Sequence, residues 1–316
     1  MNSRIKWIVA SLLAMLAVSP GGNVRQVSAQ DSDPIAVVAT IGMIGDIVGQ
    51  VGGDRVEVTS MMGPGIDPHL YKASAGDVEL IANANIVFYN GLHLEAQLGE
   101  VFERLGDRIT TVAVAEAVPE DQRIVVGTGA GTYDPHIWFD VELWAIAVEE
   151  VRRALTEYDP DNADGYEERA TDYREELTEL DSYVAEQALL VPEEQRVLIT
   201  AHDAFGYFAG AYDFEVLGLQ GVSTATEAGA GDIQELAGII VERQIPAIFV
   251  ETSVSPRSIE ALQEAVRDQG FEVVVGGALF SDAMGDADTP EGTYIGMVTH
   301  NIDTIVGALL GEISAE

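Results

Sequence analysis

Three histidines stand where imidazole side chains could bind a metal ion. His69 and His136 each end an Asp-Pro-His tripeptide, and His202 follows the apolar run 197–199. Proline fixes its own φ and restricts the residue before it, so both tripeptides present their imidazole from a stiff backbone. A lone histidine is more often structural, but the repeated tripeptide favours a shared metal site.

A carboxylate could complete this site. Asp282 lies in a loop of small residues, Phe-Ser-Asp-Ala-Met-Gly, after an apolar run. Three imidazoles and one carboxylate suit tetrahedral Zn²⁺. Mn²⁺ or Fe²⁺ would also fit, because the chain contains no cysteine and so offers no soft thiolate. Asp282 is the weakest member on pattern alone, since one aspartate among so many acidic residues is usually a surface residue.

Other polar residues near these motifs have two interpretations each. Glu251 ends a predicted strand and could orient a histidine through its other ring nitrogen. Asp67 and Asp134 could do the same, or they could cap local turns. We do not expect His93 or His300 to be ligands, because His93 precedes a predicted helix and His300 lies within one.

Alternating strand and helix patterns predict two α/β halves. The predicted strands span 35–39, 56–61, 86–89, 109–114, 196–200, 214–219, 247–251 and 271–275. The predicted helices span 42–51, 75–83 after a capping box that starts at Ser74, 95–105, 141–158 after the N-cap Asp140, 204–212, 232–243, 256–268 and 293–310. Such alternation is typical of mostly parallel sheets covered by helices, which bind ligands at the carboxyl ends of their strands. The four candidate ligands follow predicted strands.

Residues 160–192 differ from the rest because they are dense in charged residues and carry apolar residues at helical spacing. We predict one long amphipathic helix that links the two halves rigidly, the alternative being an ordinary surface helix. The predicted organisation is a signal peptide at 1–29, an N-terminal lobe at 30–159, the linking helix and a C-terminal lobe at 193–316. Each lobe then supplies two ligands to a site in the cleft between them.

The N-terminus and the charge balance indicate an exported protein. Arg4 and Lys6 precede an apolar stretch, and Val27-Ser28-Ala29 is a small-residue site for signal cleavage. A membrane anchor is the alternative, but the stretch is short for spanning. The chain has 53 acidic and 16 basic residues, which excludes nucleic acid and anionic membranes as partners. A saline habitat or a direct role in attracting cations would each explain this acidity.

Several motifs resemble the zinc and manganese solute-binding proteins of ABC importers, the TroA-like family of cluster A-I. They are GPGIDPHLYKASAGD, NGLHLE, DPHIWFD, TAHDAFGYF, GLQGVSTATEAG, IFVETSV, FSDAMG and GTYIGMVTHNIDTIV. The resemblance implies two lobes joined by one long helix. It also implies a buried metal held by His69, His136, His202 and Asp282.

Three departures from the family affect what the resemblance implies. Some manganese-specific members carry glutamate where this chain has His202, so the resemblance leaves Zn²⁺ and Mn²⁺ open. Many zinc-specific members carry a histidine-rich loop before the second Asp-Pro-His, whereas residues 121–133 contain no histidine. Many members are anchored by a lipidated cysteine. This chain has none, so we expect the mature protein to be soluble and periplasmic or extracytoplasmic.

The favoured function is capture of a divalent metal for an ABC permease, without catalysis and as a monomer. A secreted zinc hydrolase with Glu251 as base is an alternative. It is disfavoured because a catalytic zinc normally keeps an open position and because no His-Glu-x-x-His motif occurs. A metal-dependent adhesin on the same fold is the third hypothesis.

Overall fold

The N-terminal lobe is built on a four-stranded parallel sheet. The computed structural model describes residues 33–312 apart from 100, 103–107 and 128–130. The strands of this lobe are β1 (Ile35–Ala39), β2 (Val56–Ser60), β3 (Ile86–Tyr89) and β4 (Thr110–Ala113). They lie in the order β2-β1-β3-β4, and every neighbouring pair is parallel. Their carboxyl ends therefore share one edge, which is where a ligand site is expected.

Three helices of this lobe begin where the sequence predicts. They are α1 (Gly42–Gly52), α2 (Ala75–Asn83) and α4 (Val141–Tyr158). Ser74 and Asp77 form a reciprocal capping box at the start of α2. The carboxylate of Asp140 accepts a hydrogen bond from the Leu143 amide at the start of α4.

The C-terminal lobe is also parallel, but its strands form two pairs. The strands are β5 (Val197–His202), β6 (Glu215–Gln220), β7 (Ala247–Glu251) and β8 (Val274–Leu279). β5 pairs with β6 and β7 pairs with β8. The helices are α6 (Gly206–Tyr212), α7 (Ala230–Arg243), α8 (Arg257–Asp268) and α9 (Tyr294–Leu309).

Two predicted elements begin differently in the described residues. The strand expected at 271–275 begins later, at Val274, and continues through Gly276 and Gly277. A Cβ on Gly276 would lie 2.5 Å from the Ala308 side chain, so these glycines allow α9 to pack closely on the strand instead of ending it. The helix expected at 95–105 starts as a 3₁₀ turn at Ala96–Leu98, and part of that range lies outside the described residues.

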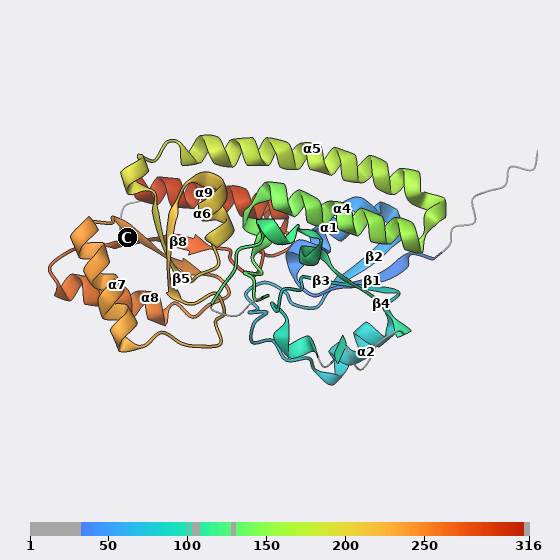
Figure 1. The fold of residues 1–316 in the computed structure, drawn as a ribbon, viewed down its shortest axis with the longest axis horizontal. Helices are drawn as coiled ribbons and strands as arrows, with labels where there is room; N and C mark the ends of the chain where they lie inside the picture. Colours follow the sequence, from blue (N-terminus) through green and yellow to red (C-terminus); the bar gives the residue numbers. More distant parts are fainter. Residues whose placement is uncertain (1–32, 100, 103–107, 128–130, 313–316) are drawn as a thin grey trace, which may run out of the picture. The chain divides into compact units, whose positions relative to one another are not determined.

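One long helix contacts both lobes. α5 (Ala163–Ala188) has 26 residues, which corresponds to about 39 Å. Its Arg169 donates to the Val51 carbonyl in α1, and its Tyr183 hydroxyl donates to Asp303 in α9. Figure 1 shows α5 running alongside α4 and α9. Because one rigid element is fixed to both lobes, the expected linking helix is present.

The boundaries between the two lobes and the linking helix do not coincide with separate compact units. Residues 34–316 form one compact unit, so the lobe boundaries at 159/160 and 192/193 stay predictions. The predicted signal peptide, residues 1–29, lies outside the described residues. Among the described helices, none is both long and apolar enough to span a membrane.

Candidate metal centre

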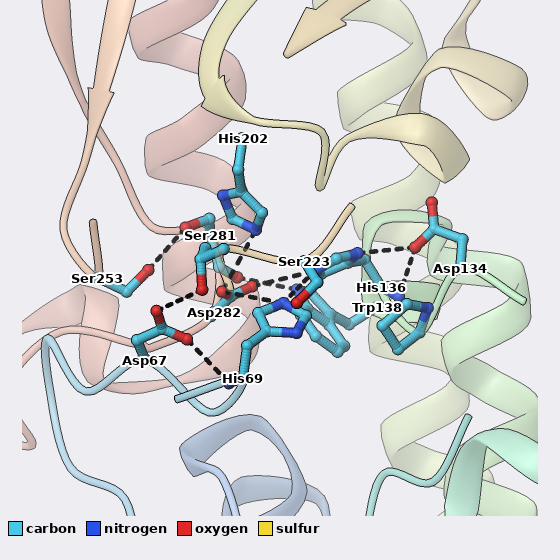
Figure 2. Close-up of polar contacts among 12 residues, drawn as sticks. Asp67, His69, Asp134, His136, Trp138, His202, Ser223, Ser253, Ser281 and Asp282 are labelled. Carbon is cyan, nitrogen blue, oxygen red and sulfur yellow. Dashed lines mark hydrogen bonds and ion pairs between the residues drawn. The ribbon is translucent and has the colours of Figure 1, made fainter. Parts of the chain in front are cut away.

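The structure brings together the four residues expected as ligands. His69 lies in the loop after β2, His136 precedes a 3₁₀ turn at Ile137–Phe139, His202 ends β5 and Asp282 follows β8. All four are buried. Figure 2 shows the three imidazoles turned toward the Asp282 carboxylate. Residues 213 positions apart in sequence thus meet because each follows or precedes a strand or turn at the same interlobe cleft.

The donor atoms of the four residues all lie within 4.8 Å of one another, and several of the distances between them match the size of a metal cage. Nε2 of His136 lies 3.3 Å from Nε2 of His69 and 3.3 Å from Asp282 Oδ1. Asp282 Oδ2 lies 3.3 Å from Nε2 of His202 and 3.7 Å from Nε2 of His69. Four atoms at ~2.0–2.1 Å from one tetrahedral Zn²⁺ would be separated by ~3.3–3.4 Å. The donor set therefore fits a small divalent ion.

Unpaired buried atoms also point to a cation. Nε2 of His202 and both carboxylate oxygens of Asp282 are buried and have no well-oriented hydrogen bond among the described residues. A buried polar group without a partner costs about 1–3 kcal/mol, and a charged group costs more. These atoms belong to one cluster of potential ligands, so a single positive ion bound there would satisfy them.

Two of the histidines are each held by a carboxylate at two points. Glu251 Oε1 accepts from the backbone amide of His202 at 2.9 Å, and Glu251 Oε2 lies 2.5 Å from Nδ1 of the same residue. Asp134 Oδ1 accepts from the His136 amide at 2.9 Å and lies 2.7 Å from its Nδ1. A carboxylate on Nδ1 leaves Nε2 directed at the metal position and increases its basicity. Glu251 and Asp134 thus lie where an orienting role requires.

The same carboxylates determine how the rings ionise. Burial opposes the charged form of His136, but Asp134 and Asp282 outweigh it and raise its pKa to about 9. His202 behaves similarly, because Asp282 and Glu251 outweigh burial and raise its pKa well above the usual value. Burial dominates at His69 and lowers its pKa to about 4. An arriving cation therefore competes with protons at His136 and His202 but not at His69.

Aromatic side chains pack around the cluster. Trp138 is fully buried and donates its indole N–H to the Ser281 carbonyl at 3.0 Å. Phe205 stacks on Phe139 with ring centroids 4.1 Å apart. The Tyr207 hydroxyl donates to the Asp134 carbonyl at 3.0 Å. These residues pack around the site and limit access of water to it.

The remaining histidines lie outside the cluster. His93 is exposed and has a positive φ of 67°. His300 contacts the Ala278 carbonyl through Nε2 at 3.1 Å. One contributor escaped the sequence analysis: the Thr224 hydroxyl donates to Asp67 Oδ2 at 2.6 Å. A threonine in a small-residue loop carries no spacing signal, so only the structure reveals it.

Comparison with known proteins places the chain in a family. Residues 37–308 match the family model described as "Zinc-uptake complex component A periplasmic". The chain is 53% identical over 282 residues to "Zinc-binding protein TroA" of Treponema pallidum, covering 89% of this chain and 91% of TroA. It is 45% identical over 302 residues to "Manganese-binding lipoprotein MntA" of Bacillus subtilis, covering 96% and 98%.

A comparison of structures also relates the chain to TroA. The structure of the periplasmic zinc-binding protein TroA from Treponema pallidum superposes with a TM-score of 0.85, covering 87% of this chain and 99% of TroA. A third relative, "Iron-binding protein YfeA" of Yersinia pestis, is 30% identical over 269 residues, which cover 85% of this chain and 84% of YfeA. Family model, sequence identity and fold agree, and the chain belongs to the family of periplasmic component A proteins of zinc-uptake complexes.

Proposed function

We propose that this protein captures one divalent transition-metal ion outside the cytoplasm and delivers it to the permease of an ABC importer. His69, His136, His202 and Asp282 are the four ligands. Two come from each lobe, so the ion clamps the lobes together. The ion is cargo, and the protein performs no catalysis on it.

The observation that carries this proposal is the convergence of buried donor atoms. Nε2 of His202 and both Asp282 oxygens lack a well-oriented hydrogen bond, and the donor atoms of the four residues all lie within 4.8 Å of one another. Three nitrogen donors and one carboxylate accept Zn²⁺, Mn²⁺ or Fe²⁺. The names of the relatives include all three metals, which is consistent with a donor set that does not select by softness.

The contacts of Glu251 argue against the hydrolase alternative. A hydrolytic zinc needs a position for water and a base free to accept a proton. In this proposal four side chains would fill the tetrahedral positions, and both Glu251 oxygens are engaged by His202. The contacts of the described residues and the names of these relatives support neither hydrolase nor adhesin.

The expected partner is a membrane permease, and the expected setting is extracytoplasmic. The family description includes the word periplasmic, and MntA is named a lipoprotein. This chain has no cysteine, and those names do not support an unanchored mature chain. Solubility after cleavage near Ala29 and a monomeric state therefore stay predictions.

Titration with Zn²⁺ and Mn²⁺, followed by calorimetry and thermal unfolding, tests the proposal. We expect one tight site per chain and a stabilisation of about 4 kcal/mol at a thousandfold excess over Kd. His202→Ala and His69→Ala should each abolish most of that stabilisation. His93→Ala is the control and should behave as wild type. Loss of the metal effect in His93→Ala with retention in His202→Ala would refute the ligand assignment.

A further inference from the structure

The three histidines of the site are not held equally. Asp134 and Glu251 each bind both the backbone amide and the ring Nδ1 of their histidine. Asp67 accepts from the backbone amide of His69 at 2.8 Å but makes no hydrogen bond with the His69 ring among the described residues. Among the described residues, no hydrogen-bond partner lies on Nδ1 of His69. The ring of His69 is therefore the least constrained of the three.

The second oxygen of Asp67 bonds to the other lobe instead. Oδ2 accepts a 2.6 Å hydrogen bond from the hydroxyl of Thr224, which lies between β6 and α7. The chain on either side of Asp67 is exposed at Ile66 and Leu70, and Gly65 has a φ of 72° that favours glycine. This loop is thus joined to the opposite lobe by the Asp67–Thr224 hydrogen bond and by the approach of His69 Nε2 to Asp282 Oδ2 at 3.7 Å.

The cleft is joined much more extensively beside His136. There Trp138 donates to the Ser281 carbonyl, and the buried Tyr294 hydroxyl donates to the Trp138 carbonyl at 2.7 Å. The Tyr207 hydroxyl crosses to the Asp134 carbonyl, and Phe205 stacks on Phe139. Separating the lobes on this side would expose large aromatic surfaces and break several buried hydrogen bonds. Opening at the His69 loop disrupts far less.

We propose that the loop carrying His69 moves to open the metal site and that the Asp67–Thr224 hydrogen bond holds this loop closed. When this hydrogen bond is formed, Asp67 positions His69 against the ion. When it is broken, His69 leaves the coordination sphere first, while His136 and His202 stay fixed by their carboxylates. Thr224 and Asp67 are positioning residues that control release of the ion. This inference rests on the proposed function, because it assigns a release route to the same site.

The test removes the Thr224 hydroxyl that forms this hydrogen bond. Thr224→Val keeps the shape of the side chain, and release of bound Zn²⁺ to an excess of chromogenic chelator is followed by stopped-flow absorbance. We expect the dissociation rate constant to rise about tenfold, because a hydrogen bond to a charged group holds the closed state. The association rate constant should change less than twofold, since the open state is unaltered.

Two further variants make the result specific. Thr226→Val is the matched control, because Thr226 lies exposed in the same loop and its side chain forms no hydrogen bond among the described residues. It should release Zn²⁺ at the wild-type rate. Thr224→Ser restores a hydroxyl and should return the rate toward wild type, which a change in packing alone would not explain.

The outcomes separate this inference from the proposed function. A Thr224→Val variant that binds Zn²⁺ and releases it at the rate of Thr226→Val would show that the Asp67–Thr224 hydrogen bond does not control release. The proposed metal-binding function would be unaffected. A change confined to the association rate constant would also contradict this role of the hydrogen bond. A wild-type protein that binds neither Zn²⁺ nor Mn²⁺ would refute the proposed function itself.

Discussion

The two sides of the metal cleft differ in how firmly they join the lobes. On the His136 side, a fully buried tryptophan, a buried tyrosine and stacked aromatic rings pass between lobes. On the His69 side, the described residues form a side-chain hydrogen bond from Thr224 to Asp67, and Nε2 of His69 lies 3.7 Å from Asp282 Oδ2. His136 and His202 have no exposed surface, whereas His69 retains 6%. One side of the cleft maintains its geometry, and the other allows exchange.

This difference reconciles two demands on a metal-delivery protein. Tight capture needs ligands that are already oriented, because ordering them at the moment of binding costs free energy. Delivery needs at least one ligand that can leave without unfolding its surroundings. Placing the two demands on opposite sides of one ion allows both within a single site, with α5 holding the lobes in a common frame.

The largest effect on stability should come from the aromatic side of the cleft. Trp138→Ala removes a fully buried side chain and its hydrogen bond to Ser281, which should lower the free energy of unfolding by about 3–5 kcal/mol. Ile66→Ala, on the opposite side, removes a side chain that is 40% exposed and should cost about 0.5 kcal/mol or less. Chemical denaturation of the two chelator-treated variants measures both.

Equal losses of unfolding free energy in Trp138→Ala and Ile66→Ala would contradict the difference between the two sides of the cleft. So would a larger loss in Ile66→Ala, because it would mean that the His69 loop supports the fold. A Trp138→Phe variant, which retains one aromatic ring but loses the indole N–H and part of the buried volume, should lose less stability than Trp138→Ala.

A smaller effect should appear as a dependence of stability on pH. The pKa of His136 is raised to about 9, above its unfolded value of 6.5, and His202 is raised as well. The stability from a raised pKa is complete below pH 6.5 and is lost as pH rises through 9. The chelator-treated protein should therefore lose on the order of 3 kcal/mol between these values. Apparent metal affinity should rise over the same range, because protons leave the rings.

His69 should respond in a different window. Its pKa is lowered to about 4, so its contribution is complete above pH 6.5 and is lost as pH falls toward 4. His136→Gln should reduce the slope between pH 6.5 and 9, with the contribution of His202 remaining, and His69→Gln should leave it unchanged. Denaturation curves at pH 6.5 and 9 decide this, and a stability that increases with pH in that range would contradict the assignment.

The sequence predicted the parts of the site that depend on local backbone. Both Asp-Pro-His tripeptides and the histidine at the end of a buried strand predicted ligands at strand ends, and these residues do meet. The capping box at Ser74 and the N-cap at Asp140 also formed as expected. Such features depend on proline and on side chains that accept hydrogen bonds from nearby amides, so a few neighbouring residues determine them.

Features that depend on distant packing could not be predicted. β8 continues through two glycines because α9 needs close approach there, and α9 lies more than fifteen residues further along the chain. The bond between Thr224 and Asp67 joins residues 157 positions apart. The different roles of Asp67 and Asp134 were likewise inaccessible, because both precede a Pro-His pair and only their surroundings differ.

Crystals of the protein loaded with Zn²⁺ or Mn²⁺ offer the most direct test of the central claim, through anomalous diffraction at the metal absorption edge. We expect one strong anomalous peak per chain, within about 2.0–2.2 Å of Nε2 of His69, His136 and His202 and of an Asp282 oxygen for Zn²⁺. A strong peak elsewhere with none between these four residues would contradict it.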